Sequence, residues 1–448
     1  MDFKAHVQRH KQHIIDETKR LLRIPSVLER YDSTSETPFG KDIQAALTHM
    51  LALAKRDGFV TKNVLNHAAH IEMGHGEELL GILCHLDVVP PGEGWTHHPF
   101  HPVIRDGKLY ARGAMDDKGP TMAVYFAMKF LKDLGVTSNR RVRLILGTDE
   151  ETGWRGVRKY LETEEMPTFG FAPDAMFPLI YGEKGIMIFD LLGTPSGGEL
   201  LSFRVGERYN VVPDHAECEL SVDLKDAYLR YLNYHDFKGE VKGNTYIAHG
   251  KSVHAMQPHL GVNAAFVLAA FLCEHIDEPY LRFIRDKLAF DPYGEKLGID
   301  MKDDEMGEFT INPGVFDYDE KTARIGIDCR YPKGFDPEAA AKTVETVSSE
   351  YGLTYAAKTV IPLHYVDPGD GLVKTLLSAY RKVTGDETSE PYTIGGGTYA
   401  RALDKAVAFG MEMPGRQDVA HQADEHLHIE DLLTSVVIYM EAIHALTR

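Results

Sequence analysis

The sequence predicts an α/β fold in which helices cover a mostly parallel sheet and an α+β segment is inserted. The first observation is that the apolar runs Leu79–Cys84 and Val142–Leu146 have the composition of buried strands. The second is that helical patterns alternate with these runs, over Pro120–Leu134 and Gly156–Leu161. The third is a change of pattern after about Glu183, where strand-like stretches replace this alternation. Ligands of such folds bind beyond the carboxyl ends of the strands.

The later part of the chain predicts an interrupted domain. Strand-like stretches occupy Ala216–Leu224 and Thr322–Cys329, with an apolar helix over Asn263–His275 between them. Mixed strand and helix patterns return from about His364 and end in an amphipathic helix over Ile429–Leu446. Since 448 residues suffice for two or three domains, we predict a catalytic domain with a first part over 1–183 and a second part over 363–448, separated by a lid domain over 184–362.

The composition excludes several classes of protein. The net charge of −18 would repel phosphate backbones, so we expect neither nucleic-acid nor membrane binding. The amphipathic first 22 residues lack the apolar core of a signal peptide, and we find no apolar run near the roughly 20 residues that cross a bilayer. The four cysteines are scattered and form no CxxC pair, unlike a secreted disulfide framework. We therefore predict a cytoplasmic protein.

Metal-competent side chains follow the predicted strands. His85 and Asp87 come directly after the first apolar run. Because residues i and i+2 of a strand share a face, Asp87 could accept a hydrogen bond from the far ring nitrogen of His85 and fix its tautomer. Taken alone, this pair is more typical of a capped strand end with a solvated histidine.

Further acidic residues occur in the same kind of position. Asp116 and Asp117 precede a predicted helix, where carboxylates also favour the positive helix end. Glu150 and Glu151 follow the second apolar run, so one could bind a metal while the other handles protons. The set is completed by Asp174 and His421. Together, two histidines and three carboxylates would suit zinc, manganese or cobalt.

The order of these motifs resembles that of a known enzyme family. HLDVVP, ARGAMDDKGP, GTDEETG, PDA and GGGTYAR, followed by a late histidine, are similar to motifs of the dinuclear zinc metallopeptidases that include aminoacylases, carboxypeptidase G and succinyl-diaminopimelate desuccinylase. Within that family, the pattern most resembles bacterial dipeptidases of the PepV or Xaa-His (carnosinase-like) type. The resemblance spans nearly the whole chain. It implies a zinc-peptidase-like catalytic domain with helices on both sheet faces and an inserted lid domain.

The resemblance also implies a ligand set for two divalent metal ions, with zinc as the default and manganese or cobalt as alternatives. His85 and Asp174 would bind one ion, Glu151 and His421 the other, and Asp116 would bridge them. Glu150 would be the general base and Asp87 would orient His85. The peptide bond between Asp116 and Asp117 would be cis.

The middle segment contains the positions that match the family's substrate contacts. His254 would stabilise the oxyanion, and Asn210 and Arg330 would hold the substrate's C-terminal carboxylate, for which the planar guanidinium is well suited. Gly396 and Thr398 would lie beside that carboxylate. From the residues alone, His254 is more typical of a surface histidine, and Arg330 of an arginine paired with a nearby aspartate. The glycine run lacks the lysine and serine spacing of a phosphate loop.

The leading function is hydrolysis of dipeptides that carry a free C-terminal carboxylate, with Glu150 activating a water between the metals. The alternatives are an N-acyl amino-acid amidohydrolase, of aminoacylase or desuccinylase type, and a catalytically silent peptide-binding relative. The resemblance favours a monomer, with a homodimer through the lid domain as the alternative. The metal, the preferred side chains and the oligomeric state are not decided by the residues.

Overall fold

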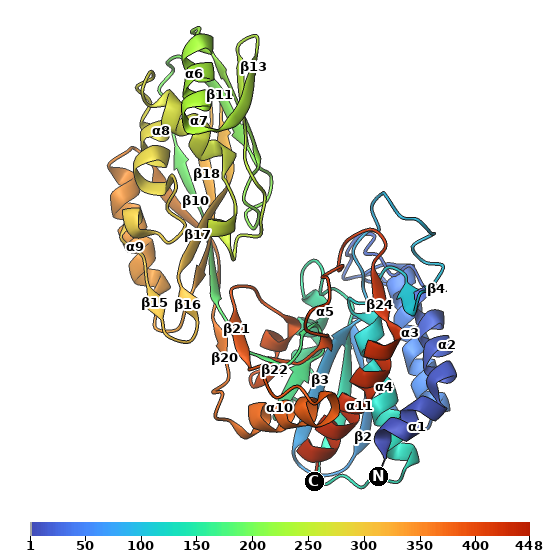
Figure 1. Cartoon of the computed structure of the whole chain (residues 1–448). Helices are drawn as coiled ribbons and strands as arrows, with labels where there is room; N and C mark the ends of the chain where they lie inside the picture. Colours follow the sequence, from blue (N-terminus) through green and yellow to red (C-terminus); the bar gives the residue numbers. More distant parts are fainter. Residues whose placement is uncertain (1) are drawn as a thin grey trace. The chain divides into compact units, whose positions relative to one another are not determined.

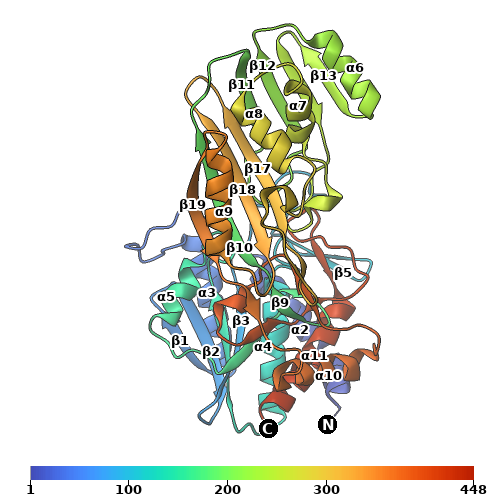
Figure 2. The same cartoon turned by 90° about the vertical axis from the view of Figure 1, so that its left-hand side faces the viewer.

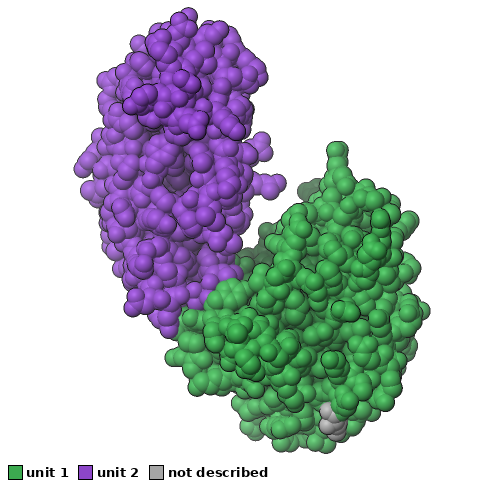
Figure 3. Space-filling view, in the orientation of Figure 1, with its two compact units in different colours: residues 1–182, 365–392, 397–448 green, residues 183–364, 393–396 purple. Residues whose placement is uncertain are grey.

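The computed structural model describes residues 2–448, which form two compact units (Figure 3). The first unit contains the chain through Gly182 together with Tyr365–Tyr392 and Gly397–Arg448. The second contains Glu183–His364 and the short segment Thr393–Gly396. Each unit has its own cluster of buried apolar side chains. The second unit is therefore an insertion in the chain of the first.

A mixed sheet forms the centre of the first unit. Its order is β1 (Val60–Val64), β2 (Ala68–Gly74), β6 (Arg141–Gly147), β3 (Leu79–His85), β7 (Phe169–Ala172), β22 (Ala406–Ala408), β9 (Ile180–Glu183) and β20 (His364–Tyr365), with β21 (Tyr392–Ile394) paired to β9. The central strands β6, β3, β7 and β22 are parallel to one another. β1 and β2 on one side, and β9 on the other, are antiparallel to their neighbours. The predicted α/β fold is confirmed, with the parallel part of the sheet confined to its centre.

Helices cover both faces of this sheet. The side chains of β2, which point alternately to the two faces, contact helices on each side. Ala69 and Ile71 point into a core that also contains side chains of the helices α1 (Phe3–Arg9), α2 (Lys11–Leu22), α3 (Lys41–Arg56), α4 (Lys118–Asp133), α10 (Gly371–Thr384) and α11 (Ile429–Leu446). His70, between them, contacts Tyr160 of α5 (Arg155–Leu161), so α5 covers the opposite face. Figure 1 shows α4 and α11 packed beside the sheet. The helix predicted over Pro120–Leu134 begins earlier, at Lys118, after the cap residue Asp117.

The second unit is built on an antiparallel sheet. Its order is β13 (Lys238–Lys242), β14 (Thr245–His249), β12 (His215–Leu220), β11 (Leu200–Val205), β17 (Thr310–Tyr318), β18 (Ala323–Tyr331), β10 (Gly185–Gly193) and β19 (Thr354–Ile361). Side chains of α6 (Lys225–His235), α7 (Ala264–Leu272), α8 (Pro279–Phe283) and α9 (Pro337–Ser349) share its core (Figure 2). The strand predicted over Ala216–Leu224 ends at Leu220, and α7 begins after Asn263, whose side chain accepts a hydrogen bond from Ala265 N. The inserted α+β segment is confirmed.

Smaller elements complete the two units. β4 (Val103–Arg105), β5 (Lys108–Tyr110) and β24 (His426–His428) form one small sheet, β8 (Ala175–Met176) pairs with β23 (Met411–Glu412), and β15 (Lys302–Asp303) pairs with β16 (Gly307–Glu308). Short helical turns occupy Pro258–Leu260, Ile284–Leu288, Glu295–Leu297 and Tyr399–Ala402. The four cysteines are free thiols. Of the helices within residues 2–448, none combines the length and the apolar character that a membrane crossing requires.

The buried pair of His70 and Tyr160 predicts a pH dependence of stability. The Nδ1 atom of His70 lies 2.8 Å from the Tyr160 hydroxyl, and burial, assisted by the charge of Arg143, lowers the pKa of His70 to about 4 from its ordinary value of 6.5. Between these two pH values the unfolded chain binds more protons at this site than the folded chain does. The contribution of His70 to stability is therefore complete above pH 6.5 and is lost as the pH falls toward 4.

We expect the urea midpoint of the wild-type protein to fall more steeply between pH 7 and pH 5 than that of a His70→Gln variant. Both tryptophans of the chain, Trp95 and Trp154, lie in the first unit, so tryptophan fluorescence reports its unfolding separately. Equal pH dependence of the two midpoints would show that His70 carries no such linkage. A His13→Gln variant on exposed helix surface is the matched control.

Candidate metal centre and substrate-binding residues

The carboxyl ends of three neighbouring parallel strands carry the predicted ligands. His85 is the last residue of β3, Glu150 and Glu151 follow the end of β6, and Asp174 follows the end of β7. β3 pairs directly with both β6 and β7. Since parallel strands end at the same edge of a sheet, residues distant in sequence are brought together there.

Two loops add the remaining ligands to this edge. Asp116 precedes α4, and His421 lies in the segment that leads to β24. One carboxylate oxygen of Asp116 is 2.9 Å from His85 Nε2, and the other is 2.9 Å from His421 Nε2. Asp174 Oδ2 lies 3.6 Å from His85 Nε2, and Glu151 Oε1 lies 3.1 Å from His421 Nε2. The five residues thus form two groups joined by Asp116.

The unpaired atoms of this cluster fit a cation. His85 Nε2 and Asp116 Oδ1 are buried, and within residues 2–448 neither has a hydrogen-bond partner of acceptable geometry despite their 2.9 Å separation. The other ring nitrogen, Nδ1, lies 3.0 Å from the Asp87 carbonyl oxygen and therefore carries the hydrogen. In the neutral form of the ring, which is the form that binds a metal, the Nε2 lone pair faces the carboxylates. Ligand atoms of His85, Asp116 and Glu151 lie within 4.8 Å of one another, as those of a metal site would.

The electrostatics of the cluster indicate a deficit of positive charge. Burial raises the pKa of Glu150 well above its ordinary value, and nearby Asp174 adds to the rise. Burial and the charge of Asp116 likewise raise the pKa of Asp174. Burial acts to lower the pKa of His85, but contacts with Asp116 and Asp174 outweigh it and raise the pKa well above its ordinary range. Two divalent cations would supply the missing charge.

The Asp87 contact differs from the prediction in one detail. The nearest acceptor for His85 Nδ1 is the Asp87 carbonyl oxygen, whereas its carboxylate oxygen Oδ1 is 3.5 Å away. The other carboxylate oxygen accepts a hydrogen bond from Glu151 N at 3.1 Å. Asp87 therefore links the segments that carry two predicted ligands. The peptide bond between Asp116 and Asp117 is cis, as the resemblance implied, and the Asp117 carboxylate accepts a hydrogen bond from His85 N at 2.9 Å.

A buried carboxylate that sequence reasoning missed holds the Asp116 loop. Glu425 accepts hydrogen bonds from the backbone N–H groups of Gly113, Met115 and Asp116, at 3.1, 2.8 and 3.3 Å. Arg112 Nη1 donates to the same carboxylate at 2.5 Å, and both side chains are buried. Glu425 stands close after His421 in the sequence, but its partners lie some 310 residues earlier in the chain, so only the fold reveals its role.

Removing the partner of this carboxylate should be strongly destabilising. An Arg112→Met variant leaves Glu425 buried without its cation, which typically lowers the free energy of unfolding by about 3–5 kcal/mol. The matched control is Arg105→Met, whose ion pair with Asp106 is exposed at both ends and is expected to contribute less than about 1 kcal/mol. Urea unfolding followed by tryptophan fluorescence measures both. Equal losses in the two variants would contradict a special role for the buried pair.

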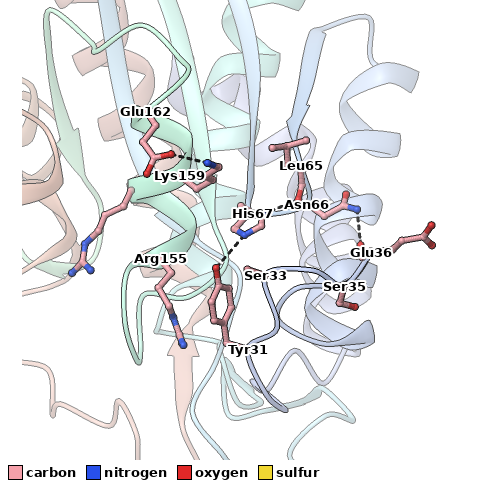
Figure 4. Close-up of a pocket in the computed structure, with 11 residues that line it drawn as sticks. Tyr31, Ser33, Ser35, Glu36, Leu65, Asn66, His67, Arg155, Lys159 and Glu162 are labelled. Carbon is pink, nitrogen blue, oxygen red and sulfur yellow. Dashed lines mark hydrogen bonds and ion pairs between the residues drawn. The ribbon is translucent and has the colours of Figure 1, made fainter.

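A second ion pair supports the loop that carries Glu150 and Glu151. Asp149 is fully buried, and Arg155 donates to its two carboxylate oxygens from Nε and Nη2, each at 2.7 Å. The Arg155 guanidinium also lies 4.4 Å from the Tyr31 ring centroid. A cavity of about 680 Å³ beside this pair is lined by the segment from Tyr31, the turn between β1 and β2, and α5 (Figure 4). This cavity is distinct from the metal-ligand cluster.

In the second unit, Arg330 is held by an aspartate. Its Nε and Nη2 atoms donate to the two carboxylate oxygens of Asp328 at 2.6 and 2.8 Å, and both side chains are buried. Its Nη1 atom donates to the Gly395 carbonyl at 3.3 Å. Arg330 is therefore paired with a nearby aspartate, and its contact with the substrate stays a prediction. The fork of Arg330 is fixed in orientation by this pairing.

Asn210 and His254 lie on backbone segments that are joined to one another. Val211 and His254 form an isolated antiparallel bridge, and Ala255 N donates to the Asn210 carbonyl at 2.9 Å. The amide nitrogen of Asn312, a buried residue that sequence reasoning missed, donates to the carbonyls on both sides of Asn210, those of Tyr209 at 2.7 Å and Val211 at 3.0 Å. Asn210 and His254 are both exposed. Hydrogen bonds from Asn312 and between the two segments fix the backbone around them.

The glycine run Gly395–Gly397 passes from the second unit to the first. A side chain at Gly395 would approach Met256 Cβ to 2.9 Å, close to the turn that carries His254. Gly396 belongs to the second unit and Thr398 to the first. The Thr398 hydroxyl accepts a hydrogen bond from Ala400 N at 3.2 Å and begins the turn Tyr399–Ala402.

The fold and the cluster define a class of protein. The parallel strands of the sheet end in one histidine and several carboxylates, and a loop aspartate joins them to a second histidine on another loop. This is the architecture of an α/β enzyme with a candidate dinuclear metal centre. Residues 81–445 match the sequence profile of peptidase family M20/M25/M40. The chain belongs to this family and is a peptide-bond hydrolase, so the family resemblance is confirmed.

Relatives of similar length support the assignment. A protein of Staphylococcus haemolyticus that carries a provisional dipeptidase name is 43% identical over 465 residues, which cover 99% of each chain. A protein of Staphylococcus epidermidis with a name of the same kind has the same identity and coverage. Human carnosine dipeptidase 1 matches 100% of this chain and 98% of its own, with a TM-score of 0.59 and 16% identity. At that identity, the likeness shows the fold alone.

Proposed function

We propose that this protein is a metal-dependent dipeptidase that hydrolyses the peptide bond of dipeptides with a free C-terminal carboxylate. The observation that carries the proposal is the position of Asp116, whose two oxygens lie 2.9 Å from His85 and from His421. A carboxylate with one oxygen toward each of two imidazoles can bridge two neighbouring cations that those imidazoles bind. The dipeptidase names of the relatives that are 43% identical support the substrate class.

Five residues would hold the metal ions. We assign His85 and Asp174 to one ion, Glu151 and His421 to the other, and Asp116 to both. Zinc is the default, and manganese and cobalt are the alternatives, because all three accept nitrogen and oxygen ligands. When bound, the two ions supply Lewis acidity, which polarises the scissile carbonyl and lowers the pKa of the attacking water.

Glu150 is the proposed general base. It follows the same strand end as Glu151, and burial raises its pKa well above the ordinary value. A carboxylate with a raised pKa can take a proton from the attacking water and return it to the leaving amine. Asp87 supports this arrangement, because it holds both the ring of His85 and the backbone of Glu151.

Residues of the second unit are proposed to bind the substrate. His254 Nδ1 accepts a hydrogen bond from Met256 N at 3.1 Å, which leaves the hydrogen on Nε2, where it can be donated to a developing oxyanion. Desolvation and the charge of Arg330 lower the pKa of His254, which favours this neutral form. We assign the C-terminal carboxylate to Asn210 and Arg330, with Gly396 and Thr398 beside it.

Reconstitution of the apo-protein tests the proposal. We expect a chelator to abolish hydrolysis of Leu-Leu and of an Xaa-His dipeptide, and added Zn²⁺, Mn²⁺ or Co²⁺ to restore it. A tetrapeptide should be a poor substrate. If no ion restores cleavage of any dipeptide although dipeptides bind, the protein is a silent relative. If N-acetyl or N-succinyl amino acids are preferred, it is an N-acyl amidohydrolase.

Two further predictions concern the protein in the cell. We propose that it acts as a monomer in the cytoplasm. The four free thiols are consistent with a reducing compartment. Light scattering at micromolar concentration tests the oligomeric state, and a dimer would contradict it.

A further inference from the structure

One strand of the second unit connects two of the proposed substrate residues. Alternate residues of β18 point to the same face of its sheet, and on the face away from the helix-covered core they are Arg324, Gly326, Asp328 and Arg330. Arg330 lies at one end of this row, where it is proposed to bind the substrate. The other end of the row contacts Tyr209, the residue that precedes Asn210. Both parts of the proposed carboxylate site are therefore linked to β18.

The ring of Tyr209 lies against a glycine of this row. A Cβ atom at Gly326 would come within 2.6 Å of Tyr209 Cε1, so the ring occupies the space that a side chain would need. The backbone of the same turn passes equally close to Gly314, at the bulge of β17, where a Cβ atom would come within 2.6 Å of the Tyr209 carbonyl oxygen. Glycines inside strands mark such close approaches. The turn that carries Asn210 is therefore in direct contact with two strands.

The hydroxyl of Tyr209 is fixed by two partners of opposite charge. It donates a hydrogen bond to Asp190 Oδ1 at 2.6 Å and accepts one from Arg324 Nη2 at 2.5 Å. The other oxygen of Asp190 lies 3.1 Å from Arg324 Nε and 3.3 Å from Lys358 Nζ. Asp190 is only 6% exposed, and hydrogen bonds to charged groups are stronger than those between neutral groups. The donor and acceptor roles of the hydroxyl are both used, so the ring is held in one orientation.

We propose that Tyr209 is a positioning residue that fixes Asn210 for the C-terminal carboxylate of the dipeptide. This inference rests on the proposed function and adds to it a residue that acts through its neighbour. Asn210 is exposed, so its place is set by the backbone that Tyr209 anchors. A group that is fixed before binding loses less conformational entropy when the substrate binds. Because Arg330 stands on the same strand, the anchor also keeps the two carboxylate-binding groups at a constant separation.

Removal of one hydroxyl tests the proposal. Tyr209→Phe keeps the ring but loses both hydrogen bonds, and we expect KM for L-leucyl-L-leucine to rise about 10-fold while kcat changes less than about threefold. Hydrogen–deuterium exchange of the backbone amides in 206–212 should become faster, which is a readout independent of turnover. The matched control is Tyr318→Phe, in the helix-covered core of the same unit, where the hydroxyl donates to the buried Glu278 at 2.7 Å. This variant should leave KM and the exchange of 206–212 unchanged.

A double-mutant cycle separates positioning from a general structural effect. Asn210→Ala should raise KM by itself, and adding Tyr209→Phe to it should raise KM further by less than about twofold, because Tyr209 acts through Asn210. Gly326→Ala displaces the ring from the opposite side and should raise KM as Tyr209→Phe does. Independent effects in the double variant, an unchanged KM in Tyr209→Phe and Gly326→Ala, or an equal rise in Tyr318→Phe would overturn the proposal. Wild-type protein that cleaves no dipeptide would instead overturn the proposed function.

Discussion

Replacing Glu150 with glutamine should lower kcat for dipeptides by about 10²- to 10⁴-fold, the usual contribution of a general acid–base residue. Glutamine keeps the size of the side chain but cannot take a proton from the attacking water. The proposed ligands are unchanged in this variant. We therefore expect both metal ions to stay bound and KM to change little, because the loss affects the transition state and not substrate binding.

Steady-state kinetics and elemental analysis of the dialysed protein measure the two effects separately. Glu162→Gln, at the exposed residue that caps the end of α5 and pairs with Lys159, is the matched control and should retain wild-type activity. Normal hydrolysis by the metal-loaded Glu150→Gln protein would refute the proposed role. Loss of metal together with activity would reassign Glu150 as a ligand.

Replacing Asp116 with asparagine should have the second large effect, on metal binding itself. Both oxygens of Asp116 face a histidine at 2.9 Å, and an amide has one oxygen and no negative charge with which to serve two cations. We expect metal affinity to fall by at least about 100-fold, since loss of even an outer contact to a ligand lowers it by 10- to 100-fold. Dipeptide hydrolysis should fall to the background of the assay.

Competition with a coloured chelator measures the affinity for each ion, and circular dichroism verifies that the variant is folded. Asp106→Asn, in the exposed turn between β4 and β5, controls for the loss of one negative charge. An Asp116→Asn protein that retains two metal ions at wild-type affinity would rule out the bridging position.

The strands and helices that place the site were accessible from sequence because their signals are local. The apolar runs that became β3 and β6, and the amphipathic pattern of α11, are set by side-chain periodicity. The predicted helix ends shifted by a few residues, as at α4, where Asp117 sets the beginning. Antiparallel pairing at the sheet edges was not predicted, because strand direction depends on partners that are distant in the chain.

The contacts that hold the ligands in place were hidden in the sequence. Glu425 stands in a polar stretch and Asn312 in a mostly apolar strand, and neither stretch contains a motif that marks them. Their importance comes from backbone groups that the fold brings to them. Arg330 differs from these two residues, because the sequence did single it out, as a substrate contact. The structure adds that Arg330 has a buried ion-pair partner in Asp328. Side-chain partners at long range follow from packing, which no local pattern encodes.

The sequence by itself determined the α/β class, the inserted segment, the family and the residue types of the candidate centre, because periodicity and ordered motifs are properties of the chain. Only the tertiary structure decided that Asp116 lies between two histidines and that a carbonyl and not a carboxylate is the nearest acceptor for His85. Those facts depend on distances between atoms from separate segments. Strand pairing and the packing of the loops set these distances. No local pattern in the sequence encodes them.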